Sequence, residues 1–394
     1  MADYALAIAG GGLTSARAVR AFREAGGEGP IALFTRDRHV PYHRPPLSKR
    51  YLRGEAEIPD TLVEPPSFYD EQGVTVHLET PIARVDPDPH EVELESGARH
   101  GYGKLLVATG GWPRKLAVPG ADLEGVMTFR TLDDSSRVKA AVGNGVSRAV
   151  VVGGSFIGSE VAASLRRLGV EVTLLHRGTG IFDALRAPEL SEHLTQLYRS
   201  EGVEVIYGDE VVAFQGHDRI SAAETRGGRR IEADLAVVGI GVAPMLELLE
   251  GSGIDIDDGV VVDGEYASSA ADVYAAGDAA NFPDPIFGRR RRIEHWSNAN
   301  YQGAEVGKVL AGAAGGYDVV SSFFSEVFGY TFKVFGDTSE FDEFQLYGSL
   351  ADGKAVGHYL AGSTLVGALS VGQDEQNEQA LKDAIAAHAS PPST

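Results

Sequence analysis

The sequence contains no cysteine among its 394 residues. Thiolate nucleophiles, redox-active disulfides, thiolate zinc sites and cysteine-held iron–sulfur clusters are therefore excluded for this chain. Basic side chains are also scarce, because 35 lysines and arginines face 56 aspartates and glutamates and leave a formal charge of −21. A nucleic-acid-binding protein needs a broad basic face to neutralise phosphates, so nucleic acid is not expected as a partner.

Long apolar runs are absent as well. No segment reaches the roughly 18 apolar residues that a membrane-spanning helix needs. The first residues lead directly into an apolar run at residues 4–9, without the basic region and cleavage site of a signal peptide. We therefore expect no membrane association and a cytoplasmic location, and we expect no metal site.

Glycine, by contrast, is plentiful, with 49 residues and no repeating triplet. This abundance indicates tight turns and close backbone approaches rather than a collagen-like repeat. The apolar share of 43% and the charged share of 23% are typical of globular proteins. A chain of this length is expected to form several domains.

One β-α-β pattern occurs twice, 143 residues apart. An apolar strand at residues 4–9 ends in glycines, a helix over 13–25 follows, and a second strand is expected at 31–34. The same order returns with a strand at 149–152, a glycine turn at 153–158, a helix to 167 and a strand at 170–175. The duplication predicts two dinucleotide-binding domains of the α/β class.

The remaining segments complete the expected organisation. Residues 91–95 alternate between charged and apolar and predict a half-exposed antiparallel strand, whereas the fully apolar residues 235–240 predict a buried parallel strand. Strands are also expected at 203–207, 211–214, 220–225, 343–349 and within 356–371, and a helix at 376–388. We expect one dinucleotide-binding domain at 1–112 and 236–316, interrupted by the second at 113–235, and a small α+β domain at 317–394.

The first glycine turn carries the pattern Gly10-x-Gly12-x-x-Ser15 between a strand and a helix. The first glycine makes the turn, and the second lets backbone amides approach a pyrophosphate at the helix N-terminus. Ser15 replaces the third glycine, which predicts looser helix–strand packing. Asp37 follows the second strand and could accept hydrogen bonds from a ribose diol. A plain strand–helix junction is the alternative interpretation.

The second turn carries Gly153-x-Ser155-x-x-Gly158. Its second strand ends at His176 and Arg177, where a nucleotide without a 2′-phosphate would favour a carboxylate. An imidazole beside a guanidinium instead suits a 2′-phosphate, which arginine can bind through two parallel hydrogen bonds. We therefore expect NADPH to be accepted; two solvated residues at a strand end are the alternative.

Five segments in fixed order carry a resemblance to a known family: residues 40–49 (VPYHRPPLSK), 108–110 (ATG), 156–160 (FIGSE), 274–278 (YAAGD) and 294–296 (EHW). The chain resembles the FAD-dependent ferredoxin reductases of the glutathione-reductase superfamily. That group includes the putidaredoxin- and biphenyl-dioxygenase-type reductases and the apoptosis-inducing-factor-like flavoproteins. The resemblance covers roughly residues 4–335 and implies two Rossmann-like domains in a glutathione-reductase-like arrangement.

The resemblance implies FAD on the first glycine turn and NADPH or NADH on the second. Asp278 then corresponds to the aspartate that binds the ribityl and phosphate part of FAD, although it could also cap a helix. Arg44 and Arg130 would lie near the FAD. The implied cofactor-binding residues are Gly10, Gly12, Leu13, Thr14, Asp37, Arg44, Lys49, Ala83, Thr109, Gly110, Arg130, Gly153, Ser155, Phe156, Ile157, Gly158, Glu160, His176, Arg177, Gly241, Gly277, Asp278, Glu294, His295, Trp296 and Phe324.

Lys49 and Glu160 resemble the family's ion pair beside flavin N5 and are the expected catalytic residues. A lysine there supplies positive charge and a donor while the flavin gains a hydride, and the carboxylate orients it. The alternatives are a surface lysine and an ordinary first-turn acid favoured by the helix dipole.

Three aromatic residues are implied to lie at the cofactors. Phe156 corresponds to an aromatic lid over the nicotinamide, and Phe324 to an aromatic residue against the isoalloxazine. The helix that begins near Trp296 is expected to direct its positive N-terminus at the flavin pyrimidine ring. For all three residues, core packing is the alternative.

Three features depart from the family pattern or stand outside it. His43 occupies the position of a glutamate, and the carboxylate at the end of the second nucleotide-domain strand is missing. The run of four arginines at residues 289–292 could steer an acidic ferredoxin to an electron exit, or it could be a solvated or internally paired loop.

The resemblance implies an NAD(P)H:ferredoxin reductase whose partner is an iron–sulfur ferredoxin that feeds an oxygenase or a P450. The missing cysteines exclude the disulfide-reducing branches of the superfamily. The alternatives are reduction of a small acceptor, such as a quinone or monodehydroascorbate, and an apoptosis-inducing-factor-like interaction protein with a redox switch. The oligomeric state is left open.

Overall fold

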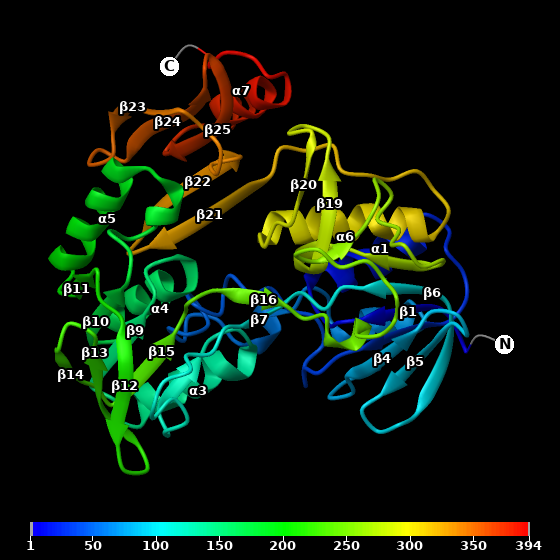
Figure 1. Ribbon diagram of the computed structural model, residues 1–394, viewed down its shortest axis with the longest axis horizontal. Coiled ribbons are helices and arrows are strands. Elements are labelled where there is room, and N and C mark those ends of the chain that lie inside the picture. The colour runs from blue at the N-terminus through cyan, green and yellow to red at the C-terminus, as the bar shows by residue number, and fades with distance from the viewer. Residues whose placement is uncertain (1–2, 393–394) are drawn as a thin grey trace. The chain divides into compact units, whose positions relative to one another are not determined.

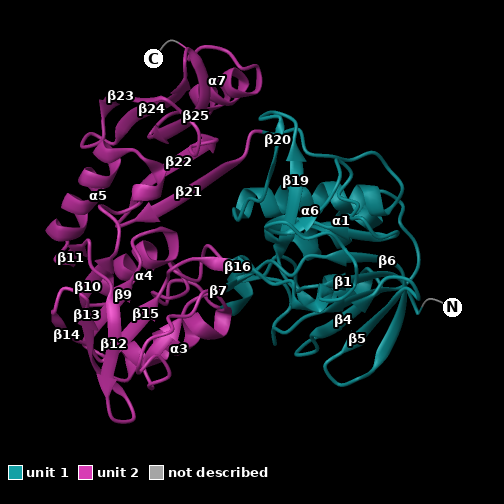
Figure 2. Cartoon of the chain, viewed as in Figure 1, with its two compact units in different colours: residues 1–43, 58–112, 243–319 teal, residues 44–57, 113–242, 320–394 magenta. Residues whose placement is uncertain are grey.

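The computed structural model describes residues 3–392 (Figure 1). The chain forms two compact units, each built from three separate segments (Figure 2). Unit 1 consists of residues 1–43, 58–112 and 243–319, and unit 2 of residues 44–57, 113–242 and 320–394. This grouping joins the expected C-terminal domain at 317–394 to the second expected dinucleotide-binding domain at 113–235. It also assigns residues 44–57, expected in the first domain, to unit 2.

A parallel sheet with the strand order β3-β2-β1-β6 forms the centre of unit 1, and β18 adds to β6. Leu6 and Ile8 are buried in one apolar cluster, whereas Ala7 and Ala9 are buried in another. Because successive strand side chains point to opposite faces, the sheet is covered on both sides. The strands are β1 (Tyr4–Ala9), β2 (Ile31–Phe34), β3 (Val74–His77), β6 (Arg99–Val107) and β18 (Val273–Ala275).

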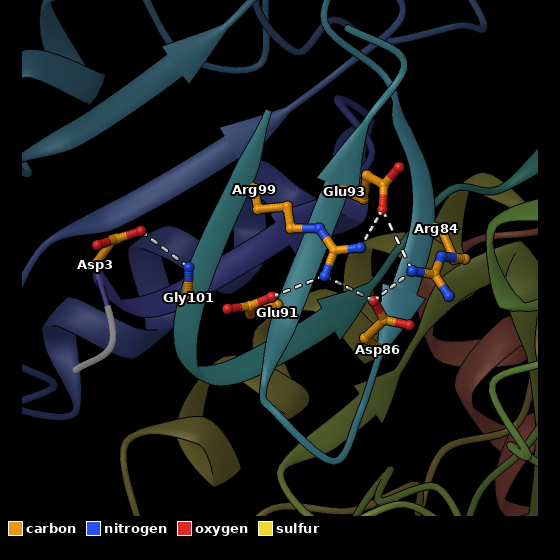
Figure 3. Close-up of polar contacts among 7 residues, drawn as sticks. All are labelled: Asp3, Arg84, Asp86, Glu91, Glu93, Arg99 and Gly101. Atoms are coloured by element: carbon orange, nitrogen blue, oxygen red, sulfur yellow. Dashed lines mark hydrogen bonds and ion pairs between the residues drawn. The ribbon is translucent and has the colours of Figure 1, made fainter. Parts of the chain in front are cut away.

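The strand β6 changes its pairing along its length. Its first residues pair antiparallel with β5 (Glu91–Leu94), which pairs with β4 (Ile82–Asp86), while its later residues pair parallel with β1. Val92 is buried, whereas Glu93 and Arg99 lie on the outer face and form an ion pair of 2.7 Å (Figure 3). The predicted half-exposed antiparallel strand is therefore confirmed.

Helices α1 (Leu13–Glu24) and α6 (Trp296–Leu310) lie side by side on one face of this sheet (Figure 1). A Cβ atom on Gly303 would lie 2.6 Å from the carbonyl oxygen of Thr14, and one on Gly307 would lie 2.5 Å from that of Ala18. The two glycines thus permit a close helix crossing that any larger residue would prevent. The other elements of the unit are α2 (Pro66–Glu71), β17 (Val260–Val261), β19 (Ala280–Asp284) and β20 (Arg289–Arg291).

A second parallel sheet, with the order β11-β10-β9-β15-β8, forms the centre of unit 2. The buried strand predicted at residues 235–240 is β15 and ends at Val238, just before Gly239. A three-stranded antiparallel sheet, β12-β13-β14, adjoins it in the same apolar cluster. The elements are β8 (Val126–Thr128), α3 (Leu132–Gly143), β9 (Arg148–Val152), α4 (Phe156–Arg167), β10 (Glu171–His176), α5 (Pro188–Ser200), β11 (Glu204–Tyr207), β12 (Val211–Gly216), β13 (Ile220–Thr225), β14 (Arg230–Glu232) and β15 (Leu235–Val238).

The C-terminal part of unit 2 is an antiparallel sheet with the order β21-β22-β25-β24-β23, packed against one helix. This arrangement confirms the predicted α+β character. The chain passes between the units at β7 (Gly111–Pro113) and β16 (Val242–Pro244), which pair with each other. The C-terminal elements are β21 (Ser322–Val327), β22 (Tyr330–Gly336), β23 (Glu343–Ser349), β24 (Lys354–Ala361), β25 (Thr364–Val371) and α7 (Glu375–Ala386).

Candidate functional site

The first glycine turn follows the carboxyl end of β1 and leads into α1. Gly10 has a φ of +120°, and a Cβ atom there would lie 2.3 Å from the carbonyl oxygen of Ala108. The N-cap is Gly12, whose position offers no side-chain cap, and the first turn of α1 carries no acid. The Ser15 hydroxyl, which is buried, donates to the Gly10 carbonyl at 2.6 Å. Serine thus closes the turn rather than loosening it.

Residues around this turn are already held by polar contacts within unit 1. The Tyr42 hydroxyl donates to one carboxylate oxygen of Asp37 at 2.5 Å, and the backbone amide of His39 donates to the other at 3.2 Å. Leu13 and Thr14 open α1, and the Thr14 hydroxyl donates to the carbonyl of Ala299 in α6. Asp37 therefore stands at the end of β2 with lone pairs to spare, as a ribose-binding carboxylate would require.

The segment before α6 brings several predicted residues together. Gly277, with a φ of +74°, donates its amide to Gln302 of α6 at 2.8 Å, and Asp278 follows in a short 3-10 turn. His295 is the N-cap of α6, lacks a side-chain cap bond and follows Glu294. Desolvation lowers the pKa of His295 to about 4, although the nearby Asp278 carboxylate acts in the opposite direction. This imidazole is therefore neutral at pH 7.

Trp296 lies at the surface of unit 1 rather than in its core. Its side chain is 38% exposed, and its indole N–H donates to Nδ1 of His43 at 3.0 Å. Burial lowers the pKa of His43, and the positive charge of Arg17 acts in the same direction. The core alternative for Trp296 is therefore wrong, and His43 serves as a hydrogen-bond acceptor for its indole.

Three further predicted residues of unit 1 lie outside these turns, two between β6 and β7 and one on β4. The Thr109 hydroxyl donates to the carbonyl of Met245 at 2.7 Å, and Gly110, with a φ of +68°, accepts from the Met245 amide. Ala83 is exposed on β4, in the antiparallel part of the sheet. Its assignment to a cofactor stays a prediction, as does that of the other residues described in this section.

The second glycine turn repeats the geometry of the first. Gly153 has a φ of +118°, and a Cβ atom on Gly158 would lie 1.9 Å from the Gly153 carbonyl oxygen. Ser155 is the N-cap of α4 but makes no side-chain cap bond, and the first turn, which includes Ile157, has no acid. Gly241 has a φ of +98° and accepts from the Arg114 amide at 2.9 Å. A helix that begins without a side-chain cap or a first-turn acid suits an anion.

The end of β10 differs from the arrangement expected for a 2′-phosphate site. His176 accepts the Gly154 amide on Nδ1 at 3.1 Å, so its Nε2 carries the proton and donates to Asp183 at 3.1 Å. Both ring nitrogens are thus engaged within the protein. Arg177 is exposed and makes no hydrogen bond or ion pair with the other residues that the structure describes.

The predicted catalytic residues meet in unit 2. Nζ of Lys49 lies 2.5 Å from Oε2 of Glu160, and the two side chains are only 9% and 6% exposed. The Ser48 hydroxyl donates to the same carboxylate oxygen at 2.6 Å, and the Ser325 hydroxyl donates to Oε1 at 2.8 Å. The alternatives of a surface lysine and an ordinary first-turn acid are therefore wrong, because the lysine is buried and the first turn of α4 carries no acid.

Residues 44–57, which carry Lys49, are attached to helices α3 and α4. Ser135 donates to the carbonyl of Leu47 at 2.7 Å, and Ser164 donates to that of Ser48 at 2.6 Å. These buried bonds explain why the segment belongs to unit 2. Arg44 begins the segment, and the backbone amide of Arg130 donates to Asp134 just before α3.

The two remaining aromatic residues have different surroundings. Phe156 makes edge-to-face contacts with Phe182 and Phe323, at centroid distances of 5.1 and 4.9 Å. Phe324 is 42% exposed, and Nζ of Lys49 lies 6.0 Å from its ring centroid. Core packing is therefore wrong for Phe324, whereas Phe156 does pack against other aromatic rings.

The arginine run at residues 289–292 is bound mostly within unit 1. Arg291 pairs with the buried Asp284 at 2.9 Å, and Arg292 pairs with Asp258 at 3.2 Å and with Glu294. Arg290 donates to two backbone carbonyls. The internally paired alternative is confirmed for Arg291 and Arg292.

Two functional candidates escaped the sequence analysis. Asp183 begins a short 3-10 helix seven residues beyond His176, and Ser325 lies 165 residues beyond Glu160. Neither belongs to a motif, so no local pattern could have found them. Among the described residues, no helix is both long and apolar enough to cross a membrane; the cytoplasmic location stays a prediction.

Comparisons with known proteins identify the family of the chain. The family model of the pyridine nucleotide-disulphide oxidoreductases matches residues 4–303. The ferredoxin reductase component of a chlorobenzene dioxygenase from Cupriavidus sp. (strain PS12) is 35% identical over 89% of this chain and 85% of its own length. A monodehydroascorbate reductase from Solanum lycopersicum is 30% identical over 100% of this chain and 96% of its own.

A solved structure extends the similarity to three dimensions. The covalent complex of putidaredoxin reductase with putidaredoxin contains a chain that matches with a TM-score of 0.92 and 29% identity, covering 98% of this chain and 94% of that one. The chain belongs to the pyridine nucleotide-disulphide oxidoreductase family and has its glutathione-reductase-like fold. It is an oxidoreductase whose relatives include ferredoxin reductases.

Proposed function

We propose that this protein is an FAD-dependent NAD(P)H:ferredoxin reductase. It takes a hydride from NADPH or NADH and passes single electrons to an iron–sulfur ferredoxin that serves an oxygenase or a P450. The observation that carries the proposal is the pair of uncapped helix N-termini, α1 and α4, each behind a glycine turn. The similarity to the ferredoxin reductase component of a dioxygenase supports the choice of acceptor.

The residues at the first turn fit an FAD pyrophosphate. The carbonyl of Ala108 leaves no space for a Cβ atom on Gly10, and no side chain occupies the amides of α1. A diphosphate would accept from these amides and benefit from the helix dipole. Asp37 would accept from the adenosine ribose, and Asp278 from the ribityl chain.

The second turn would hold the nicotinamide nucleotide in the same way. Arg177 is the group we assign to a 2′-phosphate, because it is exposed and has no partner among the described residues. His176 is held by Gly154 and Asp183 and supports the turn instead. The carboxylate of Asp183 disfavours a nearby phosphate, so both NADPH and NADH are expected to serve.

The buried pair in unit 2 supplies electrostatics for the transfer. FAD, when bound, accepts the hydride and releases its electrons one at a time. Lys49 holds positive charge and a donor for the flavin, and Glu160 fixes the ammonium in place through the 2.5 Å contact. No residue has to form a covalent intermediate, in agreement with the absence of cysteine.

The test is an anaerobic stopped-flow titration of the FAD-loaded protein with NADPH and, separately, with NADH, followed by addition of a [2Fe–2S] ferredoxin. We expect rapid flavin bleaching and rapid ferredoxin reduction. Arg177→Glu should raise the KM for NADPH far more than that for NADH. Flavin reduction over minutes, or no flavin binding at all, would contradict the proposal.

Reduction of a small acceptor is the second candidate, and the similarity to a monodehydroascorbate reductase over the whole chain favours it. The two candidates separate in one assay. Turnover with NAD(P)H is measured with ferredoxin and cytochrome c, and in parallel with a quinone and with monodehydroascorbate. A higher kcat/KM for ferredoxin supports the first candidate.

A further inference from the structure

Three consecutive residues of β21 each contact a different residue of the proposed site in unit 2. Phe323 packs edge-to-face on Phe156, Phe324 lies beneath the ammonium of Lys49, and Ser325 donates to Glu160. The sequence places β21 in the C-terminal sheet, more than 150 residues beyond α4. This strand is therefore part of the wall of the site rather than a remote element.

The register of β21 matches that of α4. Phe156 and Glu160 are separated by one helical turn, about 6 Å along the helix axis. Phe323 and Ser325 are two residues apart on a strand and point to the same face, about 6.6 Å apart. The strand can thus touch both helix residues at once, which fixes the position of Glu160 relative to Phe156.

The carboxylate of Glu160 is buried, and its two oxygens have different hydrogen-bond partners. Oε2 receives Lys49 and Ser48, at 2.5 and 2.6 Å. Within residues 3–392, Ser325 is the one group that donates a hydrogen bond to Oε1, at 2.8 Å. Ser325 itself is fully buried. A buried carboxylate oxygen without a donor is costly, so loss of this hydroxyl would allow the carboxylate to turn.

We propose that Ser325 is a positioning residue for flavin reduction. It acts through Glu160: by holding Oε1 it keeps Oε2 directed at Lys49, and the ammonium then stays at one place over the Phe324 ring. This inference rests on the proposed function, because it requires the pair of Lys49 and Glu160 to act on the flavin. It adds a residue of the C-terminal sheet to that site.

The chain contains a matched control for the same interaction outside the site. Ser370 of β25 is buried and donates to Glu378 of α7 at 2.9 Å, and Glu378 pairs with Lys333 at 2.6 Å. Ser370→Ala therefore removes the same kind of hydrogen bond, from a serine of the same sheet to a glutamate that is paired with a lysine. It controls for the structural cost of losing a buried hydroxyl.

The experiment compares Ser325→Ala with Ser370→Ala in the FAD-loaded protein. FAD content, the visible flavin spectrum, the flavin midpoint potential, the limiting rate of flavin reduction and the Kd for NAD(P)H are measured. We expect Ser325→Ala to slow the limiting rate about 3- to 10-fold, less than the full value of a hydrogen bond to a charged group because Ser325 acts through Glu160, with little change in Kd. Its spectrum and potential should shift, while Ser370→Ala keeps all wild-type values.

A second variant protects the test from a folding defect. Ser325→Cys keeps the side-chain shape, with a somewhat larger terminal atom, but offers a much weaker donor, so it should slow the limiting rate as well. The thermal midpoints of FAD-free Ser325→Ala and Ser370→Ala should fall by a similar amount, because both lose the same bond. A rate effect confined to the Ser325 variants then supports positioning rather than general destabilisation.

Glu160→Gln and Lys49→Met separate failure of the inference from failure of the proposed function. If these two variants slow flavin reduction but both Ser325 variants match Ser370→Ala, the positioning role of Ser325 is wrong and the proposed function stands. If Glu160→Gln and Lys49→Met leave the limiting rate unchanged, the ion pair has no part in the reaction. The proposed role of Ser325 then fails together with the proposed role of that pair.

Discussion

At Gly158 the backbone leaves no space for a side chain. A Cβ atom there would lie 1.9 Å from the carbonyl oxygen of Gly153, the residue that starts the second turn. Gly158→Ala should therefore force the turn open and weaken NAD(P)H binding by at least about tenfold, with FAD content unchanged. The Kd is measured by titration of the oxidised protein with NADP⁺ and NAD⁺.

The matched control is Gly143→Ala at the end of α3, where no atom lies within 4 Å of the added Cβ. Alanine is the better helix former, so this variant should be more stable by about 0.5–1 kcal/mol and bind nucleotide normally. Equal nucleotide affinity in Gly158→Ala and Gly143→Ala would show that the second turn does not bind the nucleotide.

Arg291 and Asp284 form an ion pair that is largely buried. The Arg291 side chain is 14% exposed, and the carboxylate side chain of Asp284 is 1% exposed. Arg291→Gln leaves that carboxylate buried without its counter-ion, so the free energy of unfolding should fall by about 3 kcal/mol. Urea denaturation measures this change. Arg99→Gln, which removes an exposed ion pair with Glu93 (Figure 3), should change stability far less.

The same variant tests the steering hypothesis for the arginine run. If Arg291→Gln kept its stability and instead slowed ferredoxin reduction at low salt, Arg291 would belong to a docking surface. The internal pairing predicts the opposite outcome.

Helices in this chain begin in two distinct ways. At α3 the N-cap Thr131 accepts from the Asp134 amide in a capping box, and at α7 the N-cap Asp374 accepts from the Asn377 amide. At α1 and α4 no side chain caps the helix. Side-chain caps are also missing at α2, α5 and α6, so the starts of α1 and α4 indicate a ligand only together with the glycine turns that precede them.

Ser155→Asp tests this contrast at α4. An aspartate at the N-cap should stabilise the nucleotide-free protein by about 0.5–1 kcal/mol, through a cap bond and the helix dipole. It should also weaken NAD(P)H binding more than tenfold, because a carboxylate repels the pyrophosphate. Thermal denaturation and a nucleotide titration measure the two effects, with Ser155→Ala as the uncharged control. Tighter nucleotide binding by the aspartate variant would contradict the anion site.

The elements that could be predicted are those with a local signal. The strands at 4–9 and 31–34 have the predicted bounds, because apolar residues end there at a glycine turn or a charged loop. The predicted segment 356–371 proved to be two strands, β24 and β25, joined at Gly362, whose φ is +60°. Apolar periodicity alone does not separate the two strands, whereas the pair Gly362-Ser363, with glycine first as in a type II′ turn, is the local signal that does.

The residues of the candidate site also divide into those with a local sequence signal and those without one. Lys49 and Glu160 each lie in a recognisable motif, so they could be named, but their 2.5 Å contact could not be predicted. Ser325 and Asp183 act through tertiary contacts that no neighbouring residue signals. For the same reason, the attachment of residues 44–57 to unit 2 became visible only in the structure, since it depends on buried serine hydroxyls of α3 and α4.

Across the whole molecule, five histidines share one electrostatic tendency. Burial lowers the pKa of His43, His77, His193 and His358, and it lowers that of His295 to about 4. A neutral imidazole inside the folded protein becomes protonated in the unfolded chain below about pH 6.5. The unfolded state then binds more protons than the folded state, so acid favours unfolding.

The expected result is a loss of stability as the pH falls from about 6.5 to 4, with the folded protein most stable above this window. His295 alone would account for about 3 kcal/mol across the window, since one pKa unit corresponds to 1.36 kcal/mol. Urea denaturation of the FAD-loaded protein at pH 7.5, 6 and 5 measures the trend. His295→Gln should flatten the pH dependence by one proton. An identical slope in wild type and His295→Gln would mean that His295 titrates normally in the folded protein.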